Sequence, residues 1–199
     1  MKKLWLAALT LALCLLSACG GGPELSSLDT ETVEEDCVSF LRPAAWQPAE
    51  PASAYGICAF RNEEESLSLE VVGELGTMEY YSLEELGGET AQTLADSLFA
   101  AEPDTESRCT DDYYSSVMQG QDEDGQDLVC RIDLLMPYPS VHYYLLTLAT
   151  PAAYQDNVRV LDGIRESFTL TKTDEEIYHM IQEERKAAAE EASSEQPQE

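Results

Sequence analysis

The histidines and cysteines have the side chains best suited to catalysis, and their placement argues against it. His142 lies in the alternating segment 141–145, where it could act as a base, although a histidine in such a strand is more often structural. His179 lies in a polar segment and is expected to be exposed. No serine stands in a Gly-x-Ser-x-Gly turn, and no glycine-rich loop precedes a predicted helix. We therefore expect no enzymatic activity, no catalytic residue and no cofactor.

Four cysteines in the body of the chain, Cys37, Cys58, Cys109 and Cys130, could form disulfides or bind a metal. They show no CxxC or Cys/His spacing of the kind found in zinc sites, so we expect no metal site. Three disulfide connectivities are possible. We favour Cys37–Cys58 and Cys109–Cys130, because each pair lies on strands expected to be neighbours in the sequence. Each bridge would contribute ~3 kcal/mol by restricting the unfolded chain, and isolated buried thiols are the alternative.

Acidic residues dominate the charge, with 39 Asp+Glu against 11 Lys+Arg and a formal net charge of −28. Nucleic acids are bound by basic patches, so we expect no nucleic-acid partner. The densest acidic turn, residues 122–127, has some features of a calcium loop but lacks the EF-hand spacing and its bidentate Glu. A solvated hairpin tip is therefore favoured over weak cation binding.

The first nineteen residues carry the most specific pattern in the chain. Lys2 and Lys3 precede an apolar run over residues 4–16, which is too short to span ~30 Å of hydrocarbon and is typical of a signal peptide. The run ends in Leu16-Ser17-Ala18-Cys19, which resembles the lipobox of bacterial lipoproteins. The resemblance implies removal of residues 1–18 and a diacylglycerol on Cys19, with an ordinary secretory peptide as the alternative. We expect the membrane as a partner and a lipid-anchored protein on the extracytoplasmic face of the cell membrane.

Residues 19–35 are expected to form the lipid anchor and a flexible linker. Glycines at 20–22, Pro23 and a polar stretch to Thr32 show no periodicity. A stretch of this length would reach ~40 Å when extended. An acidic domain would then stand away from anionic headgroups.

Residues 36–171 show the patterns of a single folded domain. A capping box at Ser82 to Glu85 begins a predicted helix to Phe99, with a possible break at Gly87-Gly88. Thr150 and Pro151 begin a second predicted helix. Alternation and turn residues predict the following strands: 37–41, 55–60, 66–71, 113–118, 127–136, 141–149 and 166–170.

Two segments resemble PsbP-like domains. Residues 39–46, Ser-Phe-Leu-Arg-Pro-Ala-Ala-Trp, are similar to their opening strand; residues 144–147, with Pro151, Tyr154, Ile164 and Ser167-Phe168, are similar to their closing strand, helix and strand. The resemblance covers roughly residues 36–171 and implies an α/β fold, an antiparallel sheet flanked by helices in an α/β/α sandwich. The family includes photosystem extrinsic subunits, a nuclear-transport cofactor and many bacterial lipoproteins of unknown role, so the resemblance implies a fold rather than an activity. Because four cysteines and an acidic surface depart from that pattern, it assigns no functional residue.

Paired tyrosines suggest a recognition surface. In a strand, each pair places one ring inside and one outside, and we expect Tyr81, Tyr113 and Tyr143 to be contact residues. Residues 172–199 are expected to form an acidic helix, capped by Thr173 or Asp174 and ending near Ala192, and then a disordered tail. Its Ile177 and Ile181 would either dock on the domain or contact another protein.

Together these features predict a membrane-anchored extracytoplasmic lipoprotein that acts as a non-catalytic interaction or assembly module of the cell envelope. The expected partner is another envelope protein. A solute- or cation-binding lipoprotein is the alternative.

Overall fold

The computed structural model describes residues 22–75, 82–138, 141–180, 182–183 and 186. Its elements in chain order are η1 (Leu25–Ser27), β1 (Thr30–Glu35), β2 (Val38–Pro43), β3 (Gln47–Ala49), β4 (Gly56–Arg61), β5 (Leu67–Leu75), α2 (Leu83–Leu98), β6 (Asp104–Cys109), β7 (Tyr113–Gln121), β8 (Asp127–Tyr138), β9 (Val141–Ala149), α3 (Pro151–Ser167) and β10 (Thr169–Leu170).

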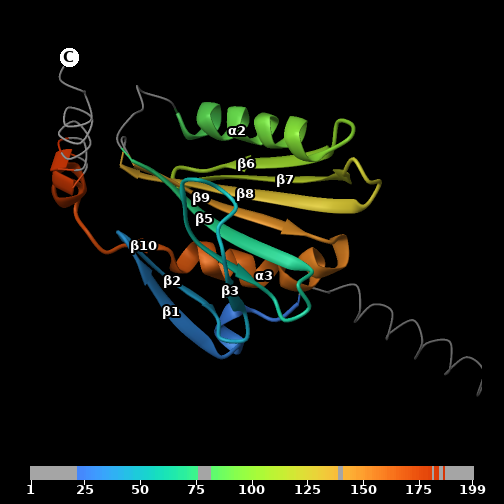
Figure 1. Cartoon of the computed structure of the whole chain (residues 1–199), viewed down its shortest axis with the longest axis horizontal. Helices are drawn as coiled ribbons and strands as arrows, with labels where there is room; N and C mark the ends of the chain where they lie inside the picture. Colours follow the sequence, from blue (N-terminus) through green and yellow to red (C-terminus); the bar gives the residue numbers. More distant parts are fainter. Residues whose placement is uncertain (1–21, 76–81, 139–140, 181, 184–185, 187–199) are drawn as a thin grey trace, which may run out of the picture.

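The centre of the molecule is a seven-stranded antiparallel sheet in the order β3-β4-β5-β9-β8-β7-β6. Helix α2 covers one face of this sheet and α3 covers the other, while the small sheet β1-β2-β10 lies on the α3 side (Figure 1). This arrangement confirms the predicted α/β/α sandwich.

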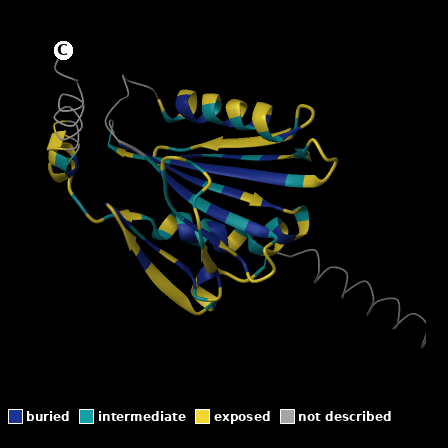
Figure 2. Ribbon diagram, in the orientation of Figure 1, coloured by how far each residue is buried: buried dark blue, intermediate teal, exposed yellow. Residues whose placement is uncertain are grey.

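Alternation along the central strands builds a separate core on each face of the large sheet. On β8, Cys130, Ile132 and Leu134 face α2 and pack with Ala91 and Ala95 of that helix. The opposite core lies against α3 and is formed from the alternate residues of β5 and β9 together with the small sheet. Dark blue buried segments therefore run along the middle of the central strands (Figure 2). Both faces of the sheet are apolar because both are covered.

Helix α2 begins where the capping box predicts. The Ser82 hydroxyl accepts a hydrogen bond from the Glu85 backbone N–H at 3.2 Å, and the Glu85 carboxylate accepts one from the Ser82 N–H at 3.1 Å. The predicted break at Gly87-Gly88 is wrong, because the helix runs unbroken through both glycines. A Cβ added at Gly87 would overlap the Tyr114 ring, so this glycine permits close packing on β7.

The predicted hairpin, the strand at 141–149 and the helix at Pro151 are also confirmed. Gly125 lies at the hairpin tip with φ of +76°, a backbone conformation that favours glycine. The Thr150 hydroxyl accepts a hydrogen bond from the Ala153 N–H and caps α3. The last strand is shorter than expected, because α3 continues to Ser167 and leaves only β10 (Thr169–Leu170).

The flexible linker expected over residues 19–35 is wrong in its second half. β1 pairs with β2 along its whole length, and Leu25 of η1 is buried against α3. A Cβ added at Gly163 of α3 would lie 2.6 Å from Leu25 Cβ, so Gly163 provides the space into which Leu25 packs. The folded domain therefore begins before residue 36.

The C-terminal segment begins a helix at Asp174 whose described part includes residues 174–180. Thr173 caps it as predicted: the Glu176 N–H donates to the Thr173 hydroxyl at 3.4 Å, and the Thr173 N–H donates to the Glu176 carboxylate at 2.8 Å. Ile177 is fully buried in the core on the α3 side of the sheet. This helix therefore docks on the domain, which was one of the two alternatives for Ile177.

Candidate functional site

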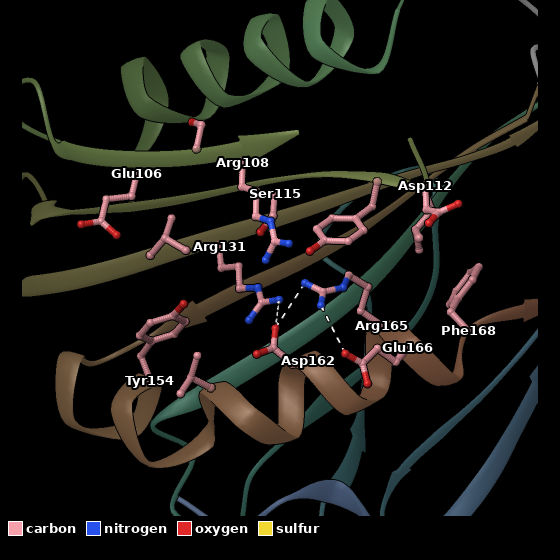
Figure 3. Close-up of a pocket in the computed structure, with 15 residues that line it drawn as sticks. Glu106, Arg108, Asp112, Ser115, Arg131, Tyr154, Asp162, Arg165, Glu166 and Phe168 are labelled. Atoms are coloured by element: carbon pink, nitrogen blue, oxygen red, sulfur yellow. Dashed lines mark hydrogen bonds and ion pairs between the residues drawn. The ribbon is translucent and has the colours of Figure 1, made fainter. Parts of the chain in front are cut away.

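A groove lies between strands β6, β7 and β8 and helix α3. Its volume is about 760 Å³. Charged and aromatic side chains point into it from both sides (Figure 3). The strands and the β6–β7 turn contribute Glu106, Ser107, Arg108, Asp112, Tyr113, Ser115, Val117, Arg131 and Leu135; the α3 side contributes Tyr154, Val158, Asp162, Arg165, Glu166 and Phe168.

A buried ion-pair network forms the floor of the groove. The Arg131 Nε donates to Asp133 at 2.7 Å and its terminal nitrogen donates to the same carboxylate at 3.1 Å, so the pair is bidentate. The same terminal nitrogen reaches Asp162 of α3 at 2.7 Å. Arg165 of α3 contacts Asp133 at 3.3 Å and Asp162 at 3.2 Å. Two arginines and two aspartates therefore join β8 to α3 with no net charge.

The network is largely buried, so its charges must be paired. Arg131 and Asp133 are each only 3% exposed in their side chains, whereas Asp162 is 42% exposed. Burial alone would lower the pKa of Arg131, but the carboxylates of Asp133 and Asp162 outweigh this effect, and the pKa is raised. The guanidinium therefore stays charged. Burial raises the pKa of the neighbouring Tyr154 hydroxyl, which stays protonated.

Tyr113 lies between the buried ion-pair network and the surface of the groove. The Arg165 guanidinium lies over its ring at 4.0 Å from the centroid, and Arg108 of β6 lies at 5.9 Å. Tyr113 is half-buried and Arg108 is exposed. The groove thus presents an aromatic ring beside two cations, one held by carboxylates and one at the rim.

The rim itself is acidic. Glu106, Asp112 and Glu166 surround the opening, and of these Glu166 lies 3.8 Å from Arg165. Arg108 forms no ion pair with any residue that the structure describes. The groove therefore offers both signs of charge to a partner, around an aromatic centre.

The predicted contact residues are only partly found in this groove. Tyr113 lines it. Tyr143 is 1% exposed, in the core under Phe168, so its prediction as a contact residue is wrong. Burial raises the pKa of Tyr143. Ile177 is likewise buried, while Cys19, Tyr81 and Ile181 lie outside the described residues.

The structure joins no two of Cys37, Cys58, Cys109 and Cys130 by a disulfide. The expected Cys109–Cys130 bridge is incompatible with the strand register: Cys109 on β6 pairs with Tyr114, whereas Cys130 on β8 pairs with Met118. The two cysteines are therefore separated by two strand spacings and four residues along the strands, roughly 16 Å, and a disulfide needs Cα atoms within about 7 Å. Burial raises the pKa values of Cys58 and Cys130 to about 12 each.

The other sequence candidates behave as structural residues. His142 is 1% exposed within β9. The turn over residues 122–127 is a hairpin tip in which Asp122 accepts hydrogen bonds from the backbone N–H groups of Asp124 and Gln126. Among the described residues, no group of three or more His, Cys, Asp or Glu side chains could hold a metal ion. No helix in that part of the chain has the length and apolarity needed to cross a membrane.

Sequence reasoning missed Arg131, Asp133, Asp162 and Arg165. A usable sign was present on β8, where Arg131 and Asp133 interrupt an otherwise apolar run at alternate positions. Alternation puts both on one face, and a charged pair on a buried face must be compensated. Asp162 and Arg165 are three residues apart and so share a face of α3. Their contact with β8 depends on the tertiary fold and cannot be read from the sequence of either segment.

Comparison with known proteins identifies the fold. No family model matches the chain, and no curated protein matches it. The solution structure of cyanobacterial PsbP (CyanoP) from Synechocystis sp. PCC 6803 has a TM-score of 0.51 at 15% identity, over 76% of this chain and 96% of that one. The Ran-binding protein Mog1p from Saccharomyces cerevisiae has a TM-score of 0.54 at 10% identity, over 73% and 97%. A mutant of protein Mog1 gives a TM-score of 0.56 at 10% identity, over 73% and 98%. The chain therefore has a PsbP/Mog1-like α/β fold.

Proposed function

We propose that this protein is a non-catalytic interaction module, held at the extracytoplasmic face of the cell membrane by lipid on Cys19, and that the groove beside α3 binds its protein partner. The observation that carries the proposal is the half-buried ring of Tyr113 with the guanidinium groups of Arg165 and Arg108 beside it. Tyrosine and arginine are enriched among the residues that contribute most binding energy at protein interfaces.

The ion-pair network supports this use of the groove because it holds one of the contact groups in place. Arg165 is 10% exposed in its side chain and bonds to Asp133 and Asp162. Its position over Tyr113 is therefore fixed before a partner arrives. Side chains that are already ordered lose less conformational entropy on binding.

The comparisons add support of a general kind. The Saccharomyces protein is named as a Ran-binding protein, so a protein with this fold can recognise another protein. At 10% identity the likeness concerns the fold and assigns no contact residue.

The proposed anchor rests on the charged and apolar leader and on the lipobox-like ending at Cys19. Gly22, three residues later, already touches α3: a Cβ added there would overlap the backbone oxygen of Asp156. Three residues span at most ~10 Å. A lipid on Cys19 would therefore hold the N-terminal end of α3 close to the membrane, and not ~40 Å above it as a flexible linker would allow.

A solute-binding lipoprotein is the second candidate. The groove's volume of about 760 Å³ falls within the usual range of small-molecule sites, roughly 300–1,000 Å³.

Site-specific photo-cross-linking would separate these candidates. A cross-linking amino acid replaces Val117 in the groove of the full chain, and in a control chain it replaces Gln92 on the exposed side of α2. In native membranes, Val117 should yield a discrete protein adduct that Gln92 does not, and Tyr113→Ala should reduce its yield about tenfold. The same adducts at both positions would contradict the proposal. A small molecule that co-purifies in place of an adduct, and is lost with Tyr113→Ala, would favour the solute-binding candidate.

The anchor is tested separately. Cys19→Ala should release the protein from the membrane fraction, and a fatty-acid label should be incorporated into the unsubstituted chain alone. Retention of Cys19→Ala on the membrane would contradict lipid anchoring and leave the groove proposal intact.

A further inference from the structure

β6 (Asp104–Cys109) forms an unprotected edge of the large sheet. All six of its residues are exposed, and in the described part of the chain it pairs only with β7. The opposite edge, β3, has three residues and contains Pro48, features that disfavour the addition of a further strand. An edge with free backbone groups is a template for another strand.

The hydrogen-bond pattern identifies which groups of β6 are available. The Thr110 N–H donates to the Tyr113 oxygen at 2.9 Å, so these two residues form a hydrogen-bonded pair. In an antiparallel ladder the direction alternates, so the backbone groups of Asp104, Glu106 and Arg108 point toward β7. Those at residues 105, 107 and 109 point outward. The edge therefore offers three N–H donors and three C=O acceptors.

A second copy of β6 matches this edge when the two-fold axis passes through Ser107. In that antiparallel register, Thr105 lies opposite Cys109 of the second copy, and all outward backbone groups are paired. Glu106 lies opposite Arg108 of the second copy, and the same pair recurs on the other side of the axis. Opposite charges directly across from each other stabilise a strand pair.

The alternative symmetric registers bring like charges together. With the axis at Thr105, Asp104 would lie opposite Glu106 of the second copy. With the axis at Cys109, Glu106 would lie opposite Asp112. With the axis at Glu106 or at Arg108, that charged residue would lie opposite its own copy. Like charges directly opposite destabilise a strand pair, so charge selects the register centred on Ser107.

We propose that two copies of this chain associate through β6 in the register centred on Ser107, which joins their large sheets into one. Arg108, which forms no ion pair with the described residues of its own chain, gains Glu106 of the second copy. Since Glu106 and Arg108 also line the groove, the two grooves meet along the shared edge. This association requires neither the lipid anchor nor a bound partner.

Cysteine cross-linking tests the register. In the full chain, Thr105→Cys should form a covalent dimer on mild oxidation, because it lies opposite the native Cys109, and adding Cys109→Ser should abolish that dimer. The unsubstituted chain should form none, since Cys109 lies about 13 Å along the strand from its own copy. Glu123→Cys, at the exposed hairpin tip, is the matched control and should also form none. A Thr105→Cys chain that stays monomeric, or that cross-links equally well without Cys109, would overturn the proposal.

Charge reversal tests the pairing in the same Thr105→Cys background. Glu106→Arg and Arg108→Glu should each lower the dimer yield about tenfold, because both pairs become repulsive. The double exchange should restore the yield, and Glu123→Arg controls for the change in net charge. Reversals without effect, or a double exchange without recovery, would overturn the proposal. Tyr113→Ala should leave the dimer intact, so failure of self-association and failure of the groove proposal are distinguishable.

Discussion

Asp133 is the point at which two arginines converge, so Asp133→Asn tests whether the ion-pair network holds α3 on the sheet. Its carboxylate accepts hydrogen bonds from Arg131 at 2.7 and 3.1 Å and from Arg165 at 3.3 Å. Asparagine keeps the shape of the side chain and removes its charge. The substitution therefore leaves Arg131 buried with one carboxylate in place of two.

The expected cost follows from burial. Arg131 is 3% exposed and cannot regain its hydration in the folded state. Removing one member of a buried pair costs about 3–5 kcal/mol. Asp162 remains 2.7 Å from Arg131, but it is 42% exposed and its charge is screened. We expect a loss near the lower limit, about 3 kcal/mol, which lowers the melting temperature by roughly 6–12 °C for a domain of this size.

Urea unfolding followed by circular dichroism measures this loss. Arg61→Gln is the control, because the Arg61–Glu65 pair is exposed and its atoms are 3.8 Å apart; it should change stability by less than about 0.5 kcal/mol. Replacing the pair together, Arg131→Met with Asp133→Leu, should recover most of the stability. A cost for Asp133→Asn no greater than that of Arg61→Gln would refute the reasoning.

Three further predictions concern the packing, the thiols and the cap of α2. Gly87→Ala and Gly88→Ala both gain about 1 kcal/mol of helix propensity, but only at Gly87 would the added Cβ overlap a neighbouring ring, that of Tyr114. Urea unfolding should therefore find Gly87→Ala less stable than Gly88→Ala by about 1–3 kcal/mol, and equal stabilities of the two variants would contradict the packing. At pH 8, exposed Cys109 should react with iodoacetamide at least about tenfold faster than Cys58, because burial raises the pKa of Cys58 to about 12; peptide mass spectrometry would show equal rates if this is wrong. Hydrogen bonds with the Ser82 backbone and hydroxyl lower the pKa of Glu85 from its ordinary 4.5, so its stabilisation is complete above that pH and is lost as the pH falls through the lowered value. Glu85→Gln should therefore flatten the dependence of stability on pH below about 4.5, and an unchanged dependence would count against the capping box.

Local signals in the sequence predicted the elements whose ends are fixed by short-range hydrogen bonds. The capping box at Ser82, Thr150 before Pro151 and the Asp124-Gly125 turn each act within four residues, so the sequence alone contains them. The break expected at Gly87 failed for a different reason. Gly87 makes room for the Tyr114 ring on β7, and a contact with a distant strand cannot be read from the residues next to Gly87.

Three strands, β1, β3 and β6, escaped prediction, and each lies at the edge of its sheet. β6 is exposed at all six positions, and β1 at all but Val33, so neither shows the apolar alternation that marks a half-buried strand. β1 is held by its backbone pairing with β2. In a sequence, a polar edge strand looks like a loop, because only its backbone pairing with the neighbouring strand distinguishes it.

Arg108, one of the few cations of this acidic chain, lies both in the groove and on the edge of the sheet. Arg42, Arg61, Arg131, Arg159 and Arg165 all lie within ion-pair distance of acids in their own chain. Arg108 differs among the described arginines, because its guanidinium forms no ion pair with the described residues and lies 5.9 Å from the centroid of the Tyr113 ring. With 39 acidic residues available, an unpaired guanidinium at an exposed edge is left open to an acid from another chain. Binding at the groove and pairing at β6 would therefore compete for the same guanidinium, so a partner that engages Arg108 should weaken self-association.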